Sequence, residues 1–261
     1  MKVGFIGVGN MGGTLAIAAS KTVEPKDILL YDLDSEKVSA LSKKTGAVAA
    51  DLEEVLKADF VFLGVKPQVL PGVLSDIKEK IGESSILVSM AAAVSIDAIC
   101  GIVGNRAVIR IMPNTPAAYS EGMMLLCSKN VEKAAVDSFK EMMSASGKVE
   151  EIPEELIDAG SAVSGCGPAF SYMFINALAE GGAKCGLSYD TALRLAAQTV
   201  LGSAKTVLMS DKSPEELRIA VCSPGGTTIE GVHALEDGNL NSLAMSAVEA
   251  AYEKTLKLAK K

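Results

Sequence analysis

A short run of small and hydroxyl residues, Ser223-Pro224-Gly225-Gly226-Thr227-Thr228, interrupts a C-terminal region that otherwise has helical periodicity. Paired glycines allow several backbone N–H groups to point at one spot, and the two threonines stand where the next helix is expected to begin. The free N–H groups and the dipole at a helix N-terminus favour an anion. The run therefore predicts a cradle for a small carboxylate, or alternatively an ordinary turn with a Thr cap. On these residues alone the two interpretations have equal weight.

A second chemistry-bearing motif, Gly7-Val8-Gly9-Asn10-Met11-Gly12, follows an apolar run at residues 2–6 and precedes a helical pattern. Strand, G-x-G-x-x-G and helix in this order form the dinucleotide-binding fingerprint. Gly7 makes the tight turn, Gly9 lets a pyrophosphate approach the backbone, and Gly12 lets helix and strand pack closely. The motif predicts a dinucleotide cofactor.

Asp32 ends the second expected strand, about 20 residues after the last glycine of that motif. An acidic residue at this place binds the ribose hydroxyls of NAD and repels the 2′-phosphate of NADP. The nearest cation is Lys37. The pattern favours NADH, unless Asp32 or Asp34 instead caps the helix that follows.

Three further segments follow expected strands at the carboxyl edge of the sheet, where ligands bind in doubly wound folds. Val65-Lys66-Pro67 brings a lysine that either meets cofactor phosphate or ribose or is solvated. Ala91 and Ala92 are small enough for a flat group to lie close. Asn114 stands on a rigid loop between two prolines, where its amide can read the nicotinamide carboxamide.

The composition excludes several classes of function. The 261 residues carry a net charge of −7, which disfavours nucleic acid or an anionic membrane as partner. No apolar run is long enough to span a bilayer, and no signal peptide is recognisable. The single histidine, His233, reads as an ordinary helix residue, and a multi-histidine metal site is impossible. Five scattered cysteines read as reduced thiols, so we expect a cytoplasmic protein without a metal site: Cys100, Cys127, Cys166, Cys185 and Cys222.

The elements that must position these residues change in type along the chain. We expect an α/β fold with an N-terminal Rossmann-type doubly wound sheet at residues 1–152 and an all-α C-terminal domain at 153–261. Strands are expected near 2–6, 28–31, 47–49, 60–63, 86–89, 108–112, 122–127 and 147–152. Helices are expected near 14–19, 35–45, 51–57, 131–144, 154–163, 168–186, 189–209, 214–221, 227–237 and 240–259.

Taken together, five motifs resemble the ordered set of the pyrroline-5-carboxylate reductases. They are Gly7-Val8-Gly9-Asn10-Met11-Gly12, Gly64-Val65-Lys66-Pro67-Gln68, Arg110-Ile111-Met112-Pro113-Asn114-Thr115-Pro116, Ser164-Gly165-Cys166-Gly167-Pro168-Ala169 and Ser223-Pro224-Gly225-Gly226-Thr227-Thr228-Ile229. The resemblance implies reduction of the cyclic imine 1-pyrroline-5-carboxylate to L-proline with NAD(P)H. It also implies a helical domain that interlocks with a second subunit, active sites across the dimer interface, and five dimers in some members.

The resemblance also implies roles for individual residues. Ser223 and the backbone amides of Gly226 and Thr227, in the loop that includes Gly225, would hold the substrate carboxylate. Thr228 would be the catalytic residue, with its hydroxyl facing the ring nitrogen. The resemblance further places three segments beside the cofactor: Asn114 and Ala91-Ala92 at the nicotinamide, and Val65-Lys66-Pro67 at the ribose and phosphates.

The chemistry of an imine agrees with the composition. A cyclic imine carries its own proton near neutrality, and an iminium is already a hydride acceptor, so no histidine acid is needed. The sequence departs from the family pattern at Cys166, where Ser is usual, at Ala93, where Gly is common, and at Asp32-Leu33-Asp34, since many members favour NADPH.

Two other functions remain as alternatives. A β-hydroxyacid dehydrogenase shares the glycine motif and a helical second domain, but it needs a catalytic lysine on the first long helix, where only Lys184 is available. A catalytically silent, nucleotide-binding regulatory protein would not need the carboxylate cradle.

Overall fold

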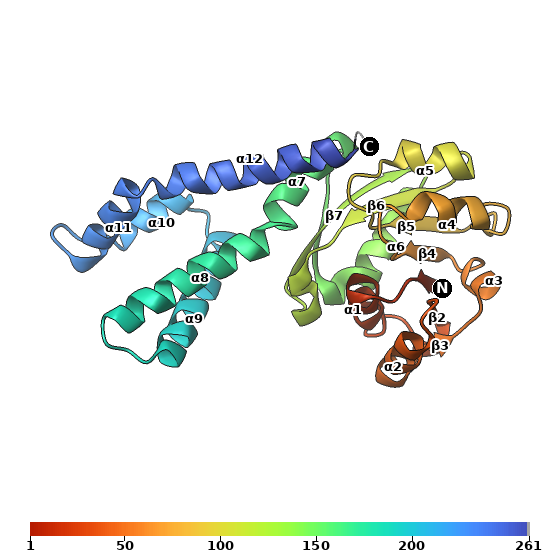
Figure 1. The fold of residues 1–261 in the computed structure, drawn as a ribbon, viewed down its shortest axis with the longest axis horizontal. Helices are drawn as coiled ribbons and strands as arrows, with labels where there is room; N and C mark the ends of the chain where they lie inside the picture. Colours follow the sequence, from red (N-terminus) through yellow and green to blue (C-terminus); the bar gives the residue numbers. More distant parts are fainter. Residues whose placement is uncertain (260–261) are drawn as a thin grey trace. The chain divides into compact units, whose positions relative to one another are not determined.

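The computed structural model describes residues 1–259, which form two units of very different construction (Figure 1). One unit comprises Met1–Cys166 together with the C-terminal end from Ala251, and the other comprises Gly167–Ala250. None of the helices within residues 1–259 is long and apolar enough to cross a bilayer.

The first unit is built on one eight-stranded sheet of order β3-β2-β1-β4-β5-β6-β7-β8, in which only the β6–β7 pair is antiparallel. The strands are β1 Val3–Ile6, β2 Ile28–Tyr31, β3 Val48–Ala49, β4 Phe60–Leu63, β5 Ile86–Ser89, β6 Val108–Met112, β7 Gly122–Lys129 and β8 Gly147–Glu151. All eight expected strands are confirmed. The strand order reverses between β1 and β4, which is the point where such sheets bind ligands.

Helices cover both faces of this sheet, as a doubly wound fold requires. Along β4, Phe60 and Phe62 enter one buried cluster and Val61 and Leu63 the other, because successive side chains point to opposite faces. The first cluster is completed by α1, α2 and α6, and the second by α3, α4, α5 and α7. The α-helices are α1 Asn10–Ala19, α2 Ser35–Thr45, α3 Leu52–Val55, α4 Leu70–Ile77, α5 Ile96–Val103, α6 Lys133–Met143 and α7 Ile157–Ser164. Short 3₁₀ turns are η1 Pro25–Asp27, η2 Thr115–Tyr119, η3 Ser144–Ser146 and η4 Glu154–Leu156.

Two of these helices, α4 and α5, were not predicted. In α4 the first turn contains Pro71 and Gly72, which in a sequence usually indicate a turn. Pro71 is tolerated there because the first helical N–H groups have no intrahelical partner. Helix α1 begins at Asn10, inside the glycine motif and earlier than the expected Thr14.

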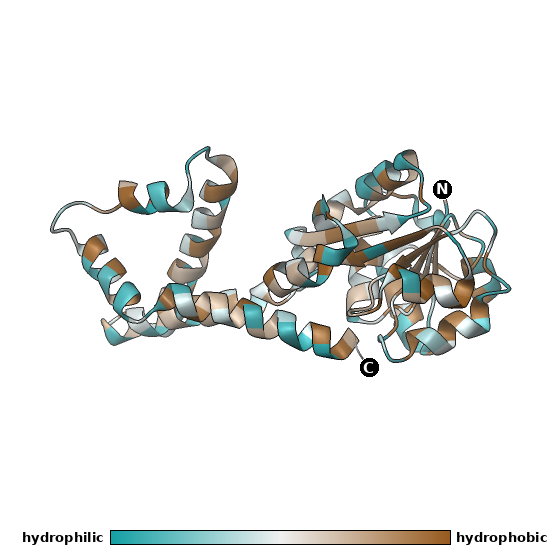
Figure 2. Ribbon diagram, turned by 90° about the horizontal axis from the view of Figure 1, so that it is seen from above, coloured by the Kyte–Doolittle hydropathy of each residue, from teal (hydrophilic) through white to brown (hydrophobic). Residues whose placement is uncertain are grey.

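The second unit is entirely helical among the residues described. Its helices are α8 Gly167–Lys184, α9 Tyr189–Met209, α10 Pro214–Ala220, α11 Thr227–Asp237 and the first half of α12 Leu240–Ala259, whose second half belongs to the first unit. All five lie within two residues of the expected spans. Helices α8 and α9 pack on each other around three buried alanines, Ala179, Ala192 and Ala196. Figure 2 shows hydrophobic bands on these helices as well as along the sheet of the first unit.

The transition between the two types of structure follows β8, which ends at Glu151. The first unit nevertheless continues to Cys166, because α7 packs on β7. Ile157 is fully buried, and a Cβ on Gly160 would lie 2.6 Å from Leu125 Cδ1. The expected boundary at 152/153 marks the end of the strands, and as a domain boundary it stays a prediction.

Candidate active site

The glycine motif forms a tight loop between β1 and α1. Two of its glycines are needed for the fold of this loop, whether or not a ligand is bound. Gly7 has φ of +88°, a backbone conformation that side chains other than glycine rarely adopt. A Cβ on Gly12 would lie 2.1 Å from the carbonyl oxygen of Gly7. A Cβ on Gly64, at the end of β4, would lie 2.3 Å from the same oxygen, so this glycine belongs to the loop although it was not among the expected cofactor residues.

Gly9 is different, since no protein atom lies within 4 Å of the position a Cβ would take there. It is the residue before α1, and no side chain caps the helix. The first N–H groups of any helix have no intrahelical acceptor, and here no side chain accepts from them. The helix dipole also favours an anion at this end. Open space above Gly9 and a free helix start fit the diphosphate of a dinucleotide.

Asp32 lies at the end of β2 and is tied to the glycine loop. Its carboxylate accepts hydrogen bonds from the backbone N–H of Val8 at 2.8 Å and of Asp34 at 3.0 Å. The helix cap is Asp34, which accepts from the N–H groups of Glu36 and Lys37. Of the two interpretations of these acids, capping therefore belongs to Asp34, which leaves Asp32 at the cavity.

Lys37, the cation nearest to Asp32 along the chain, is already paired. Its Nζ lies 3.1 Å from Asp34 Oδ2, and this hydrogen bond holds the pKa of the Asp34 carboxyl below its ordinary value. The pair is exposed to solvent, so its contribution to stability is small.

A cavity of about 660 Å³ opens at the carboxyl edge of β1, β2 and β4. It is lined by six of the predicted cofactor residues: Gly7, Gly9, Asn10, Asp32, Val65 and Lys66. The other predicted cofactor residues do not line it: Met11, Gly12, Pro67, Ala91, Ala92 and Asn114. Gly12 acts by letting α1 approach β1, which needs no contact with the cavity.

Asn114 is buried, with 8% of its surface exposed, and the protein holds its amide on both sides. Its Nδ2 donates to the carbonyl oxygen of Ser164 at 2.9 Å, and its Oδ1 accepts from the N–H of Met123 at 2.9 Å. The side chain thus joins the end of α7 to β7. Its contact with a nicotinamide stays a prediction, as does that of Ala91-Ala92.

Ala93 has φ of +61°, in the left-handed region that favours glycine. Because alanine has a Cβ, this conformation costs backbone strain of about 1–2 kcal/mol. Glycine, the residue expected here from the resemblance, would avoid that strain. The strained residue lies directly after Ala91-Ala92.

The Ser223–Thr228 loop of the second unit is a tight turn followed by a helix start. Gly225 has φ of +65°, and the N–H of Gly226 donates to the carbonyl oxygen of Ser223 at 3.0 Å. No side chain caps α11, so the interpretation of a threonine cap is wrong. The amide of Gly226 is engaged within the turn, whereas those of Thr227 and Thr228 lie in the first helical turn, where N–H groups have no intrahelical acceptor.

His233 lies on α11 with most of its side chain exposed, and its Nδ1 lies 3.3 Å from Asp237 Oδ2. It is an ordinary surface residue of a helix, as predicted. Among residues 1–259 no three His, Cys, Asp or Glu side chains gather as a metal site. All five cysteines are free, and burial raises the pKa of the Cys127 thiol to about 12.

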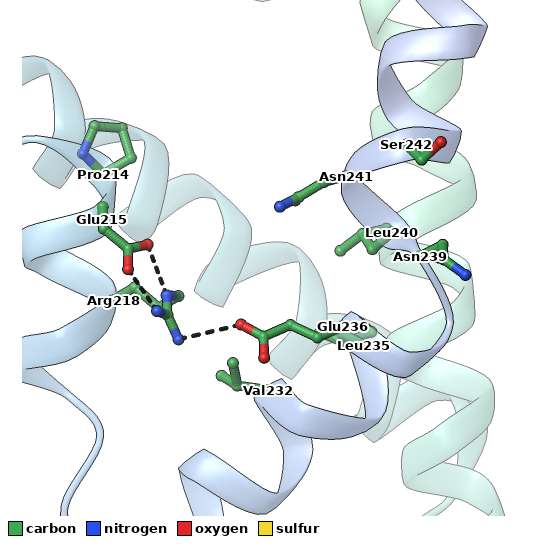
Figure 3. Close-up of a pocket in the computed structure, with 10 residues that line it drawn as sticks. All are labelled: Pro214, Glu215, Arg218, Val232, Leu235, Glu236, Asn239, Leu240, Asn241 and Ser242. Carbon is green, nitrogen blue, oxygen red and sulfur yellow. Dashed lines mark hydrogen bonds and ion pairs between the residues drawn. The ribbon is translucent and has the colours of Figure 1, made fainter.

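A second cavity, of about 730 Å³, lies among α10, α11 and α12 (Figure 3). Arg218 there is flanked by two carboxylates, with its Nε 2.8 Å from Glu215 Oε2 and its Nη1 3.6 Å from Glu236 Oε1. Because these carboxylates already neutralise its charge, Arg218 is not a free receptor for a substrate anion. No residue of the Ser223–Thr228 loop lines this cavity.

Comparisons with known proteins cover the whole chain. The family model for pyrroline-5-carboxylate reductase dimerisation matches residues 154–258, and a model for NADP oxidoreductase, coenzyme F420-dependent, matches residues 2–93. Pyrroline-5-carboxylate reductase 3 of Danio rerio is 40% identical over 266 residues, covering 100% of this chain and 92% of that protein. Pyrroline-5-carboxylate reductase of Escherichia coli (strain K12) is 38% identical over 265 residues, covering 99% of this chain and 98% of that protein.

Solved structures agree. A pyrroline-5-carboxylate reductase from Coxiella burnetii matches with a TM-score of 0.93 and 32% identity, covering 100% of this chain and 99% of that one. The Plasmodium falciparum pyrroline carboxylate reductase with NADP bound matches with a TM-score of 0.88 and 32% identity, covering 99% and 98%. These matches confirm the resemblance drawn from the five motifs and favour it over a β-hydroxyacid dehydrogenase. The chain belongs to the pyrroline-5-carboxylate reductase family.

Proposed function

We propose that this chain reduces 1-pyrroline-5-carboxylate to L-proline, the final step of proline biosynthesis, with NAD(P)H as hydride donor. Family membership over the full length supports the activity. The observation that carries the cofactor is the cavity at the uncapped start of α1, which is lined by Gly7, Gly9, Asn10 and Asp32 together.

The nucleotide-binding residues act by holding and orienting. Backbone N–H groups at Gly9 and the first turn of α1 would hold the diphosphate, and Asp32 would hold the adenosine ribose. Lys66, which lines the same cavity, provides a positive charge near the phosphates. When bound, NAD(P)H supplies the hydride that reduces the C=N bond.

The substrate residues act by hydrogen bonding. The carboxylate is held by the Ser223 hydroxyl and the Thr227 N–H, with Gly225 and Gly226 shaping the turn. The Thr228 hydroxyl pairs with the ring nitrogen and orients the imine. Because the imine arrives protonated, no side chain has to donate a proton during hydride transfer. The reaction requires that this loop meet the nicotinamide, and family resemblance implies that it does so across a dimer interface.

We also propose that NADH is preferred over NADPH. The Asp32 carboxylate would repel a 2′-phosphate, and Lys37, the cation nearest to it along the chain, is already paired with Asp34.

The test is oxidation of NADH and of NADPH at 340 nm with 1-pyrroline-5-carboxylate, both cofactors side by side. Faster turnover with NADH supports both proposals. Faster turnover with NADPH keeps the reductase and removes the preference. No turnover with either cofactor contradicts the activity and favours a nucleotide-binding regulatory protein.

The chain self-associates through its helical dimerisation domain. We propose the dimer as the active unit, with assembly of five dimers as a further step, and we propose a cytoplasmic location because all five cysteines are free. Light scattering after gel filtration distinguishes a dimer from a decamer.

A further inference from the structure

A buried positive charge in β6 has no role in the site described above. Arg110 is 3% exposed and lies between two carboxylates of the segment that follows the sheet. Its Nη1 is 3.2 Å from Glu154 Oε1 and its Nη2 is 2.7 Å from Asp158 Oδ1. We refer to Arg110, Glu154 and Asp158 as the Arg110 cluster.

The cluster joins three elements. Glu154 Oε1 also accepts the N–H of Ile96, the first residue of α5, at 2.7 Å, and Asp158 belongs to α7. The start of α7 is thereby fixed to β6 and α5. The end of α7 is fixed separately, because the carbonyl oxygen of Ser164 accepts the hydrogen bond from Asn114.

Stability alone does not explain this arrangement. A buried ion pair costs much of what it gains through loss of solvation, and apolar residues of similar volume often do as well. Here one guanidinium faces two carboxylates, while its Nε is buried with no acceptor among residues 1–259. The cluster does fix the orientation of the elements that it joins. A planar guanidinium bonded to two carboxylates allows only one arrangement of the three side chains.

Helix α7 is the segment by which the chain leaves the sheet and enters the helical unit at Gly167. We propose that Arg110 is a positioning residue for hydride transfer: by holding the start of α7, the cluster keeps Ser164 in place and, through it, the Asn114 amide that we expect at the nicotinamide. This rests on the proposed reductase activity. A displacement of about 1 Å between donor and acceptor costs about 100-fold in rate, so a small movement of α7 has a large effect.

The experiment uses the full-length protein with NADH and 1-pyrroline-5-carboxylate. In Arg110→Met we expect kcat to fall about 10- to 100-fold, while the Kd of NADH, measured by fluorescence, stays within about twofold. The primary deuterium isotope effect on kcat should rise with 4-deuterated NADH, because hydride transfer becomes the slow step. Arg110→Lys, which keeps the charge but not the two-pronged geometry, should recover part of kcat.

The matched control is Arg106→Met. Arg106 belongs to the same unit, and its guanidinium donates to the carbonyl oxygens of Gly82 at 2.9 Å and Lys78 at 3.5 Å, both far from α7 in the sequence. Its kcat should stay within about twofold of wild type. If Arg110→Met does not fold, Asp158→Ala replaces it, which keeps the Arg110–Glu154 pair and should lower kcat about 3- to 10-fold.

An unchanged kcat in a folded Arg110 or Asp158 variant overturns the proposal. So does a Kd of NADH that rises in parallel with the loss of kcat, because that indicates general loosening of the sheet. The wild type is measured first. If it shows no turnover, the proposed function fails; if it turns over and the variants match it, only the positioning role fails.

Discussion

The two units differ in how many large apolar side chains they bury. The first unit encloses large side chains such as Phe5, Phe62 and Leu74 on both faces of its sheet. The second unit, Gly167–Ala250, buries only three alanines and leaves large apolar side chains in solvent. These include Met173, Leu195, Leu201, Leu208, Met209, Leu243 and Met245, each more than half exposed. The first unit buries its apolar side chains within its own chain, whereas the second exposes a large apolar surface, as expected of the dimerisation domain that its sequence matches.

The two candidate ligand sites differ in how they are supported. The nucleotide loop is held by its own backbone and by Asp32, so it is formed in the single chain. The Ser223–Thr228 loop joins two helices that have no core beneath them in the single chain. Substitutions in the two units should therefore fail in different ways.

The largest effect is expected at Gly12. A valine would place its Cβ at 2.1 Å from the Gly7 carbonyl oxygen, so α1 must shift from the sheet and NADH affinity should fall more than about 100-fold. Gly9→Ala is the matched variant, because its Cβ enters open space. It should keep the wild-type Tm and still lose about tenfold in NADH affinity. A normal affinity in Gly9→Ala would mean that the diphosphate binds elsewhere.

The next effect tests the exposed apolar surface of the second unit. Leu201 on α9 is 56% exposed, and Leu201→Asp should dissociate the dimer, since burying a leucine contributes about 1.5–3 kcal/mol and the interface contains two copies. NADH binding to the first unit should survive. Val48→Asp, on edge strand β3 of the first unit, is the control and should leave the sedimentation coefficient of the dimer unchanged. A dimeric Leu201→Asp would place the interface on another face.

A smaller effect is expected at the hydroxyl of Thr228, which we propose as the catalytic residue. Thr228→Ala should lower kcat/KM by one to three orders of magnitude, about 1.4–4 kcal/mol of transition-state stabilisation. NADH affinity and the dimer should be unchanged. Thr228→Ser retains a hydroxyl and should recover most of the rate. Wild-type kinetics in the alanine variant would remove Thr228 from the mechanism.

The smallest effect is expected at the only histidine. His233→Gln should change kcat/KM by less than about twofold across pH 6–9, because its imidazole is exposed and pairs only with Asp237. A pH profile that loses a limb in this variant would show that the imidazole does take part in proton transfer.

Much of the fold followed from local patterns. The buried parallel strands are continuous apolar runs, and two helices of the second unit begin at serine caps, α9 at Ser188 and α10 at Ser213. Helix α4 was missed because Pro71 and Gly72 resemble a turn. Of the residues that line the cofactor cavity, those in the glycine fingerprint and Asp32 could be predicted from the sequence.

The remaining features depend on contacts between distant parts of the chain. Nothing in the sequence near Asn114 indicates that its amide is held by Ser164 and Met123. In the same way, Arg110 appears in an apolar strand without its partners, because Glu154 and Asp158 are more than 40 residues away. The engagement of the Gly226 amide was not predictable either, because it depends on the φ of Gly225.

We propose that one unit holds the hydride donor and the other holds the imine carboxylate. The most direct measurement is a crystal structure of the dimer with NADH and L-proline, the reaction product. We expect the diphosphate over Gly9 at the start of α1, and the proline carboxylate within hydrogen-bond distance of Ser223 Oγ and the Thr227 N–H. A carboxylate bound away from the Ser223–Thr228 loop, or a diphosphate away from Gly9, would contradict it.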